Sequence, residues 1–199
     1  ISKNKIKTIL EYTRKNNTLI VIDESFIDFV RDKNKYTVND FINKYDNLFI
    51  LRSFTKIFSI PGLRLGYGVG SEVLINKMET NKDPWSVNVF AQLVGEKLLD
   101  KEKYCQQCRV EITSEKDRLY ESLSKIDGIR PLNSKVNFLL LNIAASGKTS
   151  TEITSKLARK GFIVRNCNSF KTLGEKYIRI AVKSHNDNKQ LIEALKEVI

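Results

Sequence analysis

Residues 47–70 have the sequence NLFILRSFTKIFSIPGLRLGYGVG, and this stretch decides the fold class. Its first part, Asn47–Leu51, is a short continuous apolar run, typical of a strand buried on both faces of a sheet. A similar run, TLIVI, occupies Thr18–Ile22, and a short helix is predicted between the two at Val38–Lys44. A third, glycine-rich strand is predicted at Leu65–Val69. The order strand, helix, strand implies an α/β fold with a mainly parallel sheet covered by helices.

The rest of the chain predicts further helices and a second group of strands. The predicted helices are Lys3–Asn16, Glu72–Thr80, Val87–Leu99, Lys101–Ser124, Thr151–Lys160 and Asn186–Val198. The predicted later strands are Asn137–Ile143, Phe162–Arg165 and Tyr177–Val182. Since the pattern changes beyond Gly128, we expect a small C-terminal α+β domain at residues 119–199, after a first domain at residues 1–118.

Composition and charge argue against two classes of partner, nucleic acids and membranes. The 199 residues carry 34 Lys and Arg and 23 Asp and Glu, a net charge of +11. The lysines are scattered among acidic residues and are not interleaved with aromatics, so we expect no nucleic-acid partner. The chain has no apolar run long enough to span a membrane and no signal peptide, so we expect no membrane partner. The first residue is not Met, and we expect a fragment of a longer protein.

The three cysteines predict neither a disulfide framework nor a metal site. An odd count in a lysine-rich chain without a signal peptide indicates a reducing, cytoplasmic location. Cys105 and Cys108 form one C-x-x-C pair within a predicted helix, and His185 is the single histidine. Because a zinc site needs about four ligands, we interpret the pair as chance spacing on a helix and predict no metal.

Lys56 is the strongest candidate for chemistry. It follows a predicted buried strand and is flanked by the hydroxyls of Ser53 and Thr55, with Arg64 downstream. A lysine amine can form a Schiff base with an aldehyde cofactor, and hydroxyls with a guanidinium suit a phosphate. The nearby glycines could let other groups approach closely. The alternative is a solvated lysine in an ordinary loop: S-x-T-K alone is unspecific, whereas the whole run RSFTKIFSIPGLRLGY is specific.

Asp23 is the second candidate, at the carboxyl end of the first apolar run in VIDESFIDF. Parallel α/β sheets place ligand-binding groups at strand carboxyl ends. A carboxylate there could keep a cofactor's pyridine nitrogen protonated. The alternative is an aspartate that caps a helix or a turn. With Asp23 and Lys56 both at strand ends of one sheet, we favour the functional interpretation.

Together these motifs resemble fold-type I pyridoxal-phosphate enzymes, and most closely the threonine-phosphate decarboxylases of cobalamin biosynthesis. The segments that carry the resemblance are VIDESFIDF, LRSFTKIFSIPGLRLGYGVG, KDPWSVNVFAQLVGE, NFLLLNI, GFIVRNCNSF and KYIRIAVKSHNDNKQLIEAL. They cover nearly all of the chain in the order of the family. The resemblance implies the aspartate-aminotransferase fold, with residues 1–118 as the C-terminal part of the large pyridoxal-phosphate-binding domain. The histidinol-phosphate aminotransferases share this framework.

The resemblance also implies roles for the residues that bind pyridoxal 5'-phosphate. Lys56 would form the Schiff base with it, and Asp23 would pair with its pyridine nitrogen. Ser53, Thr55 and Arg64 would hold its phosphate. The same resemblance implies a homodimer that acts on a small phosphorylated amino acid.

For the substrate, the resemblance implies that Arg179 binds the carboxylate and Arg165 the phosphate. Taken from the sequence alone, each arginine is better explained as a solvated charge at a strand end. Histidinol-phosphate aminotransferases carry a tyrosine three residues after the pyridine-binding aspartate, where this chain has Phe26. This favours the decarboxylation of L-threonine O-3-phosphate to (R)-1-amino-2-propanol O-phosphate. The alternatives are a histidinol-phosphate aminotransferase and, in another class, a non-catalytic fragment or assembly module.

Several parts of the family's site are absent from this chain. They are an Asn-Pro-rich loop, a glycine-rich turn that binds the cofactor phosphate, and an aromatic residue that stacks on the cofactor ring. The chain therefore resembles the C-terminal part of such an enzyme, and we expect the activity to belong to the full-length protein and not to this segment alone.

Overall fold

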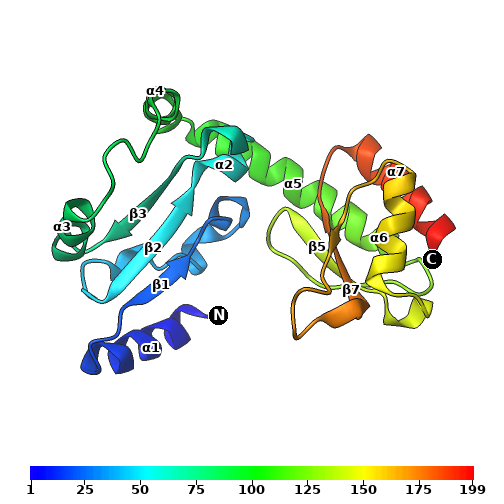
Figure 1. The fold of residues 1–199 in the computed structure, drawn as a ribbon, viewed down its shortest axis with the longest axis horizontal. Helices are drawn as coiled ribbons and strands as arrows, with labels where there is room; N and C mark the ends of the chain where they lie inside the picture. The colour runs from blue at the N-terminus through cyan, green and yellow to red at the C-terminus, as the bar shows by residue number, and fades with distance from the viewer. The chain divides into compact units, whose positions relative to one another are not determined.

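The computed structural model describes residues 1–199, which form two compact units, residues 1–109 and 110–199. The division falls within helix α5 (Glu102–Leu123), the helix that also contains the expected domain boundary at 118/119. The predicted class is confirmed, because each unit combines a β-sheet with α-helices (Figure 1). No helix combines the length and the apolarity that crossing a bilayer requires.

A three-stranded sheet organises the first unit, in the order β1 (Ile20–Asp23), β2 (Leu48–Ser53) and β3 (Gly66–Gly70). β1 and β2 are parallel, as predicted for the two apolar runs, and Asp23 lies opposite Leu51. β3 pairs with β2 in the antiparallel direction. The twelve residues 54–65 join β2 to β3 and contain only short helical turns, whereas parallel neighbours are usually joined through a longer crossover helix.

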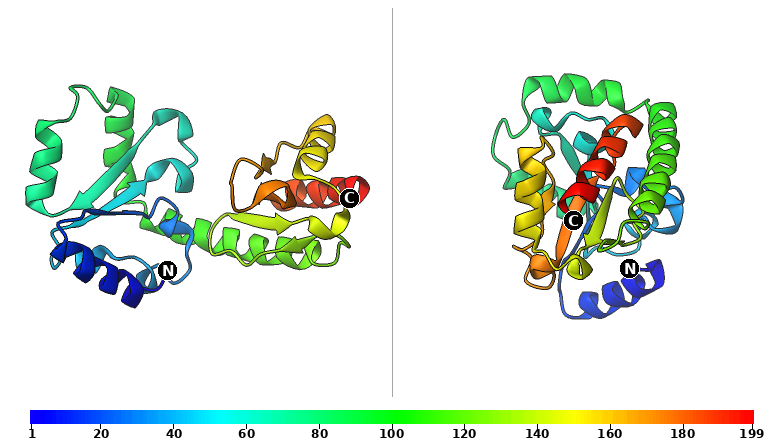
Figure 2. Two further views of the ribbon diagram at one scale, coloured as in Figure 1. Left: turned by 60° about the horizontal axis from the view of Figure 1, so that its bottom comes forward. Right: turned by 90° about the vertical axis from the view of Figure 1, so that its right-hand side faces the viewer.

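The first unit also contains helices and 3-10 turns. These are α1 (Lys3–Lys15), η1 (Ile27–Phe29), η2 (Lys33–Lys35), η3 (Asn39–Phe41), α2 (Phe54–Ile57), η4 (Pro61–Leu63), α3 (Glu72–Thr80) and α4 (Val89–Leu98). α1 lies along one face of the sheet (Figure 2, dark blue), where Ile6 and Leu10 pack with Leu48 and Ile50 in one apolar cluster. The hydroxyl of Ser2 caps α1 by accepting a bond from the amide of Lys5.

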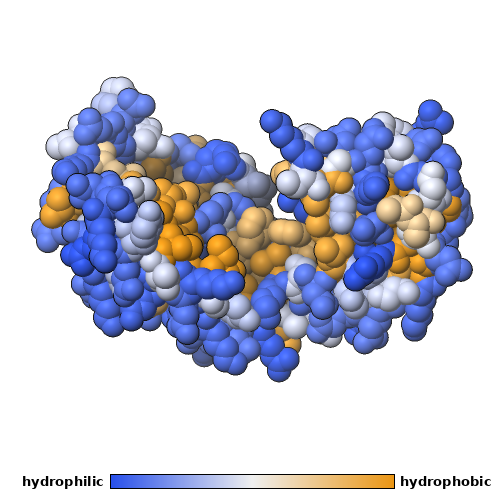
Figure 3. All heavy atoms as spheres, turned by 90° about the horizontal axis from the view of Figure 1, so that it is seen from below, coloured by the Kyte–Doolittle hydropathy of each residue, from blue (hydrophilic) through white to orange (hydrophobic).

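The strands of this sheet are not buried on both faces, and that prediction was wrong. Val21 of β1 is 53% exposed and Leu51 of β2 is 39% exposed. Apolar atoms accordingly reach the surface of the first unit (Figure 3, orange). An apolar run indicates that a strand is suited to burial. It does not show that another segment packs on the second face of the sheet.

The predicted helix at Val38–Lys44 is also wrong, because only the 3-10 turn η3 forms there. The amide of Val38 donates to the carboxylate of Glu24 over 2.8 Å, a long-range bond that holds the start of the segment in place. β-Branched and Asn or Asp residues lower its helix propensity.

The second unit has a four-stranded antiparallel sheet in the order β4 (Arg130–Pro131), β5 (Phe138–Asn142), β7 (Tyr177–Ala181) and β6 (Arg165–Asn166). The strand predicted at Phe162–Arg165 is displaced to β6, and β4 was not predicted. Helices α6 (Ser150–Arg159) and α7 (His185–Val198) share one apolar core with α5 and with alternate residues of β5 and β7. The loop after α6 turns at Gly161, which adopts the left-handed conformation expected of its position.

Two of the three glycines of β3 are required by the ring of Phe49 on the neighbouring strand. A Cβ atom at Gly68 would overlap this ring, and one at Gly70 would lie 3.1 Å from its Cδ2. Phe49 is buried although it lies on the same face as the exposed Val21. The glycine-rich pattern therefore creates space for an aromatic ring, in line with the predicted close approach.

We predict that Gly68→Ala lowers the free energy of unfolding by about 1–3 kcal/mol, because the methyl group overlaps Phe49. Urea denaturation followed by circular dichroism measures the change. Gly62→Ala is the matched control, because nothing lies within 4 Å of its added Cβ. Adding Phe49→Leu to Gly68→Ala should cost less than the two separate losses combined. Equal stability of the Gly68 and Gly62 variants would contradict this packing.

Candidate functional site

Asp23 and Ser53 lie on the same face of the first sheet and at the same edge. β1 ends at Asp23 and β2 at Ser53, and the two strands are parallel. Asp23 is opposite Leu51, and Ser53 lies two residues further along, so the alternation of side chains puts both polar groups on one face. This confirms the expected meeting of the strand ends.

Lys56 joins this edge through the short helix α2. Ser53 caps α2: its Oγ accepts a bond from the amide of Thr55 and lies 2.7 Å from the Thr55 hydroxyl. The Lys56 amine donates to the same Ser53 Oγ over 3.2 Å. Ser53 thus connects the strand end, the second hydroxyl and the amine.

The amine of Lys56 also lies over an aromatic ring. Its Nζ is 5.3 Å from the centroid of Phe26, a cation–π distance. The sequence drew attention to Phe26 only because it lacks a hydroxyl. The structure adds that Phe26 contacts Lys56 and contributes to its surroundings.

The carboxyl group of Asp23 is held in its ionised form. Hydrogen bonds from the hydroxyl and the amide of Ser25 lower the pKa of Asp23 below its ordinary value, and the nearby charge of Lys56 adds to this. The amide of Ser25 donates to Oδ1 over 2.8 Å. The turn through Ser25 thus keeps the carboxylate ionised and available to a positively charged partner.

Arg64 is an exposed residue that follows η4 and precedes β3, with a left-handed backbone (φ 56°). Its Nη1 donates to the carbonyl of Pro61 over 2.8 Å. Two residues later, Gly66 pairs with Ser53, so Arg64 belongs to the same edge of the sheet as the hydroxyls. A guanidinium has five donors, and this bond leaves others free for an anion.

Arg165 and Arg179 face each other in the second unit, directly opposite across the pairing of β6 with β7. Both side chains are exposed, on the sheet face opposite to the apolar core. Each guanidinium lies over an aromatic ring: Arg179 is 4.8 Å from the centroid of Phe138, and Arg165 is 5.8 Å from that of Phe170. Two adjacent cations on a half-open face can bind anions.

Sequence reasoning missed three of these neighbours. Ser25 could have been found, because a serine two residues after an aspartate is typical of an Asx turn. Phe138 and Phe170 carry no such signal. Their contacts with the arginines depend on strand pairing and on the loop after β6, neither of which a local pattern specifies.

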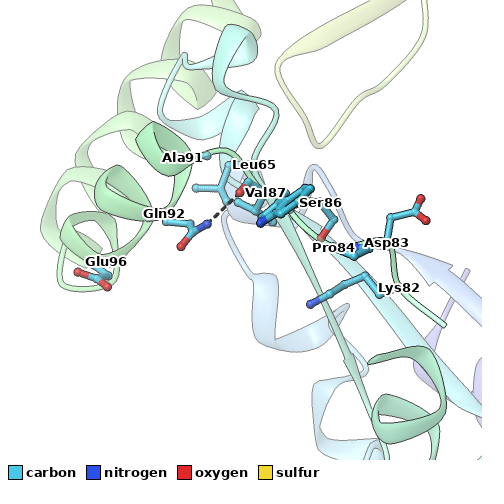
Figure 4. A pocket seen from close by; sticks show the side chains of 11 residues that line it. Leu65, Lys82, Asp83, Pro84, Ser86, Val87, Ala91, Gln92 and Glu96 are labelled. Carbon is cyan, nitrogen blue, oxygen red and sulfur yellow. Dashed lines mark hydrogen bonds between the residues drawn. The ribbon is translucent and has the colours of Figure 1, made fainter. Parts of the chain in front are cut away.

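One hollow in the first unit is lined by residues other than Lys56. It is an open groove of about 720 Å³ between the Lys82–Val87 loop and α4 (Figure 4). Gln92 closes one side by donating to the carbonyl of Val87 over 2.8 Å. Asn88 caps α4 and also donates to the carbonyl of Leu63, so this loop supports the turn that precedes Arg64. The residues that line the groove include neither Lys56 nor Asp23.

The side chains at the sheet edge fit a cofactor with an aldehyde, a phosphate and a basic ring nitrogen. The amine of Lys56 suits the aldehyde, and the hydroxyls of Ser53 and Thr55, with Arg64, suit the phosphate. The ionised carboxylate of Asp23 suits a protonated ring nitrogen. This fit rests on the donor set at one edge of one sheet.

Comparison with known proteins gives a consistent result. The model of the family described as aminotransferase class I and II matches residues 1–195. The chain is 40% identical over 196 residues to a predicted threonine-phosphate decarboxylase of Caldanaerobacter subterraneus subsp. tengcongensis, covering 98% of this chain and 53% of that protein. It is also 40% identical over 199 residues to a histidinol-phosphate aminotransferase of Methanosphaera stadtmanae, covering 100% of this chain and 52% of the other.

Solved structures show the same fold. The histidinol-phosphate aminotransferase of Clostridium acetobutylicum superimposes with a TM-score of 0.93 at 30% identity, covering 100% of this chain and 59% of that one. The chain spans about half the length of the curated relatives it matches.

We predict that Ser25→Ala raises the pKa of Asp23 toward its ordinary value, because the largest cause of its lowering is lost. Lys56→Gln should raise it less. Since the native pKa is lowered, the ionised carboxylate stabilises the fold above the ordinary pKa of 3.8, and this contribution disappears as the pH falls. Carboxyl ¹³C NMR titration measures both variants. Asp40, whose pKa is lowered by Lys3, is the internal control and should not move. An unchanged Asp23 titration in Ser25→Ala would contradict the assignment.

Proposed function

The chain belongs to the aminotransferase class I and II family, and on that premise we propose that it supplies the Schiff-base lysine, Lys56, of a decarboxylase that acts on L-threonine O-3-phosphate. The cofactor of this family is pyridoxal 5'-phosphate. The observation that carries the proposal is the meeting of Asp23, Ser53 and Lys56 on one face at one strand edge. The activity is proposed for the full-length enzyme that contains this chain.

Each residue at the edge has a proposed task. Lys56 holds the cofactor aldehyde, Asp23 bonds its ring nitrogen, and Ser53, Thr55 and Arg64 bind its phosphate. When bound, the cofactor supplies an electron sink for the bond that breaks at the substrate α-carbon. Once the substrate is in place, the Lys56 amine is free to carry a proton to that α-carbon. The Ser53 hydroxyl, 3.2 Å from the amine, orients it.

Two arginines are proposed to bind the two anionic ends of the substrate. Arg179 would bind the carboxylate and Arg165 the phosphate. Their placement supports this, because like charges directly opposite in a sheet reduce stability and are better explained by a shared anionic ligand. The stacked rings of Phe138 and Phe170 restrict both guanidiniums before substrate arrives.

The choice of reaction depends on which substrate bond stands perpendicular to the cofactor plane. A decarboxylase holds the carboxylate there, and an aminotransferase the α-hydrogen. Relatives named for either activity are equally identical to the chain, at 40%. Phe26 favours the decarboxylase, because it presents an apolar ring to Lys56 where the aminotransferases usually carry a tyrosine hydroxyl.

Histidinol-phosphate aminotransferase is the second candidate, favoured by the match along the whole chain to enzymes of that name. A non-catalytic assembly module is disfavoured, because Lys56, Asp23 and Arg64 are kept together at one edge of the sheet. Homodimer formation, which the resemblance implies, stays a prediction.

We predict that borohydride reduction of the full-length enzyme with pyridoxal phosphate attaches the cofactor to Lys56, identified by peptide mass spectrometry. Lys56→Ala should abolish this label. Lys44→Ala, a change of a lysine in the same unit outside the site, should leave it intact. Label on a different lysine in the wild type would refute the assignment.

We predict that the full-length enzyme releases carbon dioxide from threonine phosphate and makes no glutamate from histidinol phosphate with 2-oxoglutarate. Arg165→Ala and Arg179→Ala should each lower kcat/KM by about ten- to a hundredfold, because each loses a charge-assisted contact. Arg165→Ala should also reduce the preference for threonine phosphate over threonine, whereas Arg179→Ala should raise the ratio of abortive transamination to decarboxylation. Glutamate from the second mixture without carbon dioxide from the first would establish the aminotransferase instead.

A further inference from the structure

A buried ion pair lies directly behind the site, on the opposite face of β1 and β2. Glu24 follows Asp23, and Arg52 precedes Ser53, so side-chain alternation turns both away from the site. Glu24 Oε2 and Arg52 Nη2 are 2.7 Å apart, and their side chains are only 5% and 13% exposed. Neither residue was a sequence-based candidate, because only the strand pairing brings them together.

A loop between the strands completes this cluster. The Thr37 hydroxyl donates to Glu24 Oε2 over 2.8 Å, and the amide of Val38 donates to Oε1 over the same distance. Arg52 Nη2 donates to the Thr37 oxygen over 2.9 Å. The carboxylate of Glu24 is thereby bonded to Arg52 of β2 and to the loop at Thr37 and Val38, and it cannot turn without breaking several of these bonds.

Stability alone does not account for this pair. Moving two charges out of water costs free energy that their attraction rarely exceeds, and apolar replacements of similar volume are often equally stable. Here the cost is higher, because the Nε of Arg52 is buried without a hydrogen-bond partner. We therefore explain this ion pair by the strand ends that it holds in place, and not by a contribution to stability.

The ion pair lies at the point where the backbone hydrogen bonds between β1 and β2 end. β1 ends at Asp23, and beyond it one backbone bond remains, from the amide of Glu24 to the carbonyl of Leu51. After that, β1 enters the Ser25 turn and β2 enters α2. The ion pair is the next connection across the two strand ends.

We propose that Glu24 and Arg52 are positioning residues for the cofactor site. Their ion pair sets the distance between the end of β1, which carries Asp23, and the end of β2, which carries Ser53 and leads to Lys56. The inference rests on the proposed function, because it assigns the pair to the residues that would hold pyridoxal phosphate. The two residues touch neither cofactor nor substrate and act through their chain neighbours.

The test uses the double variant Glu24→Leu, Arg52→Leu, which removes both charges together and avoids leaving one of them buried alone. Urea denaturation should show a folded protein with a lowered midpoint, because the Thr37 hydroxyl and the buried Val38 amide also lose their acceptor. The dissociation constant for pyridoxal phosphate, measured on the full-length enzyme, should rise by about tenfold or more, the effect of weakening one bond to an ionised group. In Lys3→Ala, Asp40→Ala, which removes a surface ion pair of the same unit, the constant should not change.

A second measurement needs no cofactor. Neither Glu24 nor Arg52 is among the groups that set the pKa of Asp23, so their direct charge effect on it is small. If the two strand ends separate, the charge of Lys56 acts less on Asp23, and the pKa of Asp23 rises toward its ordinary value. A purely structural role for the pair would leave this titration unchanged in a variant that folds.

The outcomes separate the two proposals. If the wild type fails to bind pyridoxal phosphate at Lys56, the proposed function fails, and the inference fails with it. If the wild type binds and the folded double variant keeps both the affinity and the Asp23 titration, only the positioning role is wrong. If the double variant does not fold, Glu24→Asp with wild-type Arg52 replaces it. This shorter carboxylate should raise the dissociation constant and the Asp23 pKa in the same directions, and unchanged values would overturn the inference.

Discussion

Parallel pairing between β1 and β2 is the constraint on which the first unit depends. Because both strands run the same way, their carboxyl ends meet at one edge, and the register that sets Asp23 against Leu51 decides which side chains share a face. A shift of one residue would exchange Asp23 with Glu24 between the two faces. The site on one face and the buried ion pair on the other are thus two results of the same register.

Much of this arrangement could be predicted from the sequence, because its signals are local. The apolar runs before Asp23 and Ser53 identified the two strands, and helices with clear caps, such as α1 and α6, were found within one or two residues. The direction of β3 could not be predicted, because alternation along a strand does not encode its direction. Glu24 and Arg52 escaped notice because their partnership depends on pairing between segments far apart in the chain.

Both units contain local features that lower the stability of the fold. Arg165 and Arg179 stand opposite each other in one sheet, and Arg64 and Trp85 adopt left-handed backbone conformations that non-glycine residues rarely tolerate. Trp85 is in addition 96% exposed. Such departures cluster near functional regions in many proteins, where the surrounding structure maintains them. In this chain the Arg64 turn is maintained by Asn88, which bonds to Leu63 from the cap of α4.

The open face of the first sheet has a practical consequence for work with this chain. Val21 and Leu51 expose apolar surface there, and β1 and β3 are both edge strands whose outer backbone groups lack a strand partner. An apolar face next to an unpaired edge is a template for edge-to-edge aggregation. Self-association of the purified 199-residue polypeptide at high concentration is therefore expected from this apolar face and its unpaired strand edges. Light scattering should be compared across dilutions and mild detergent before any such complex is taken for a physiological assembly.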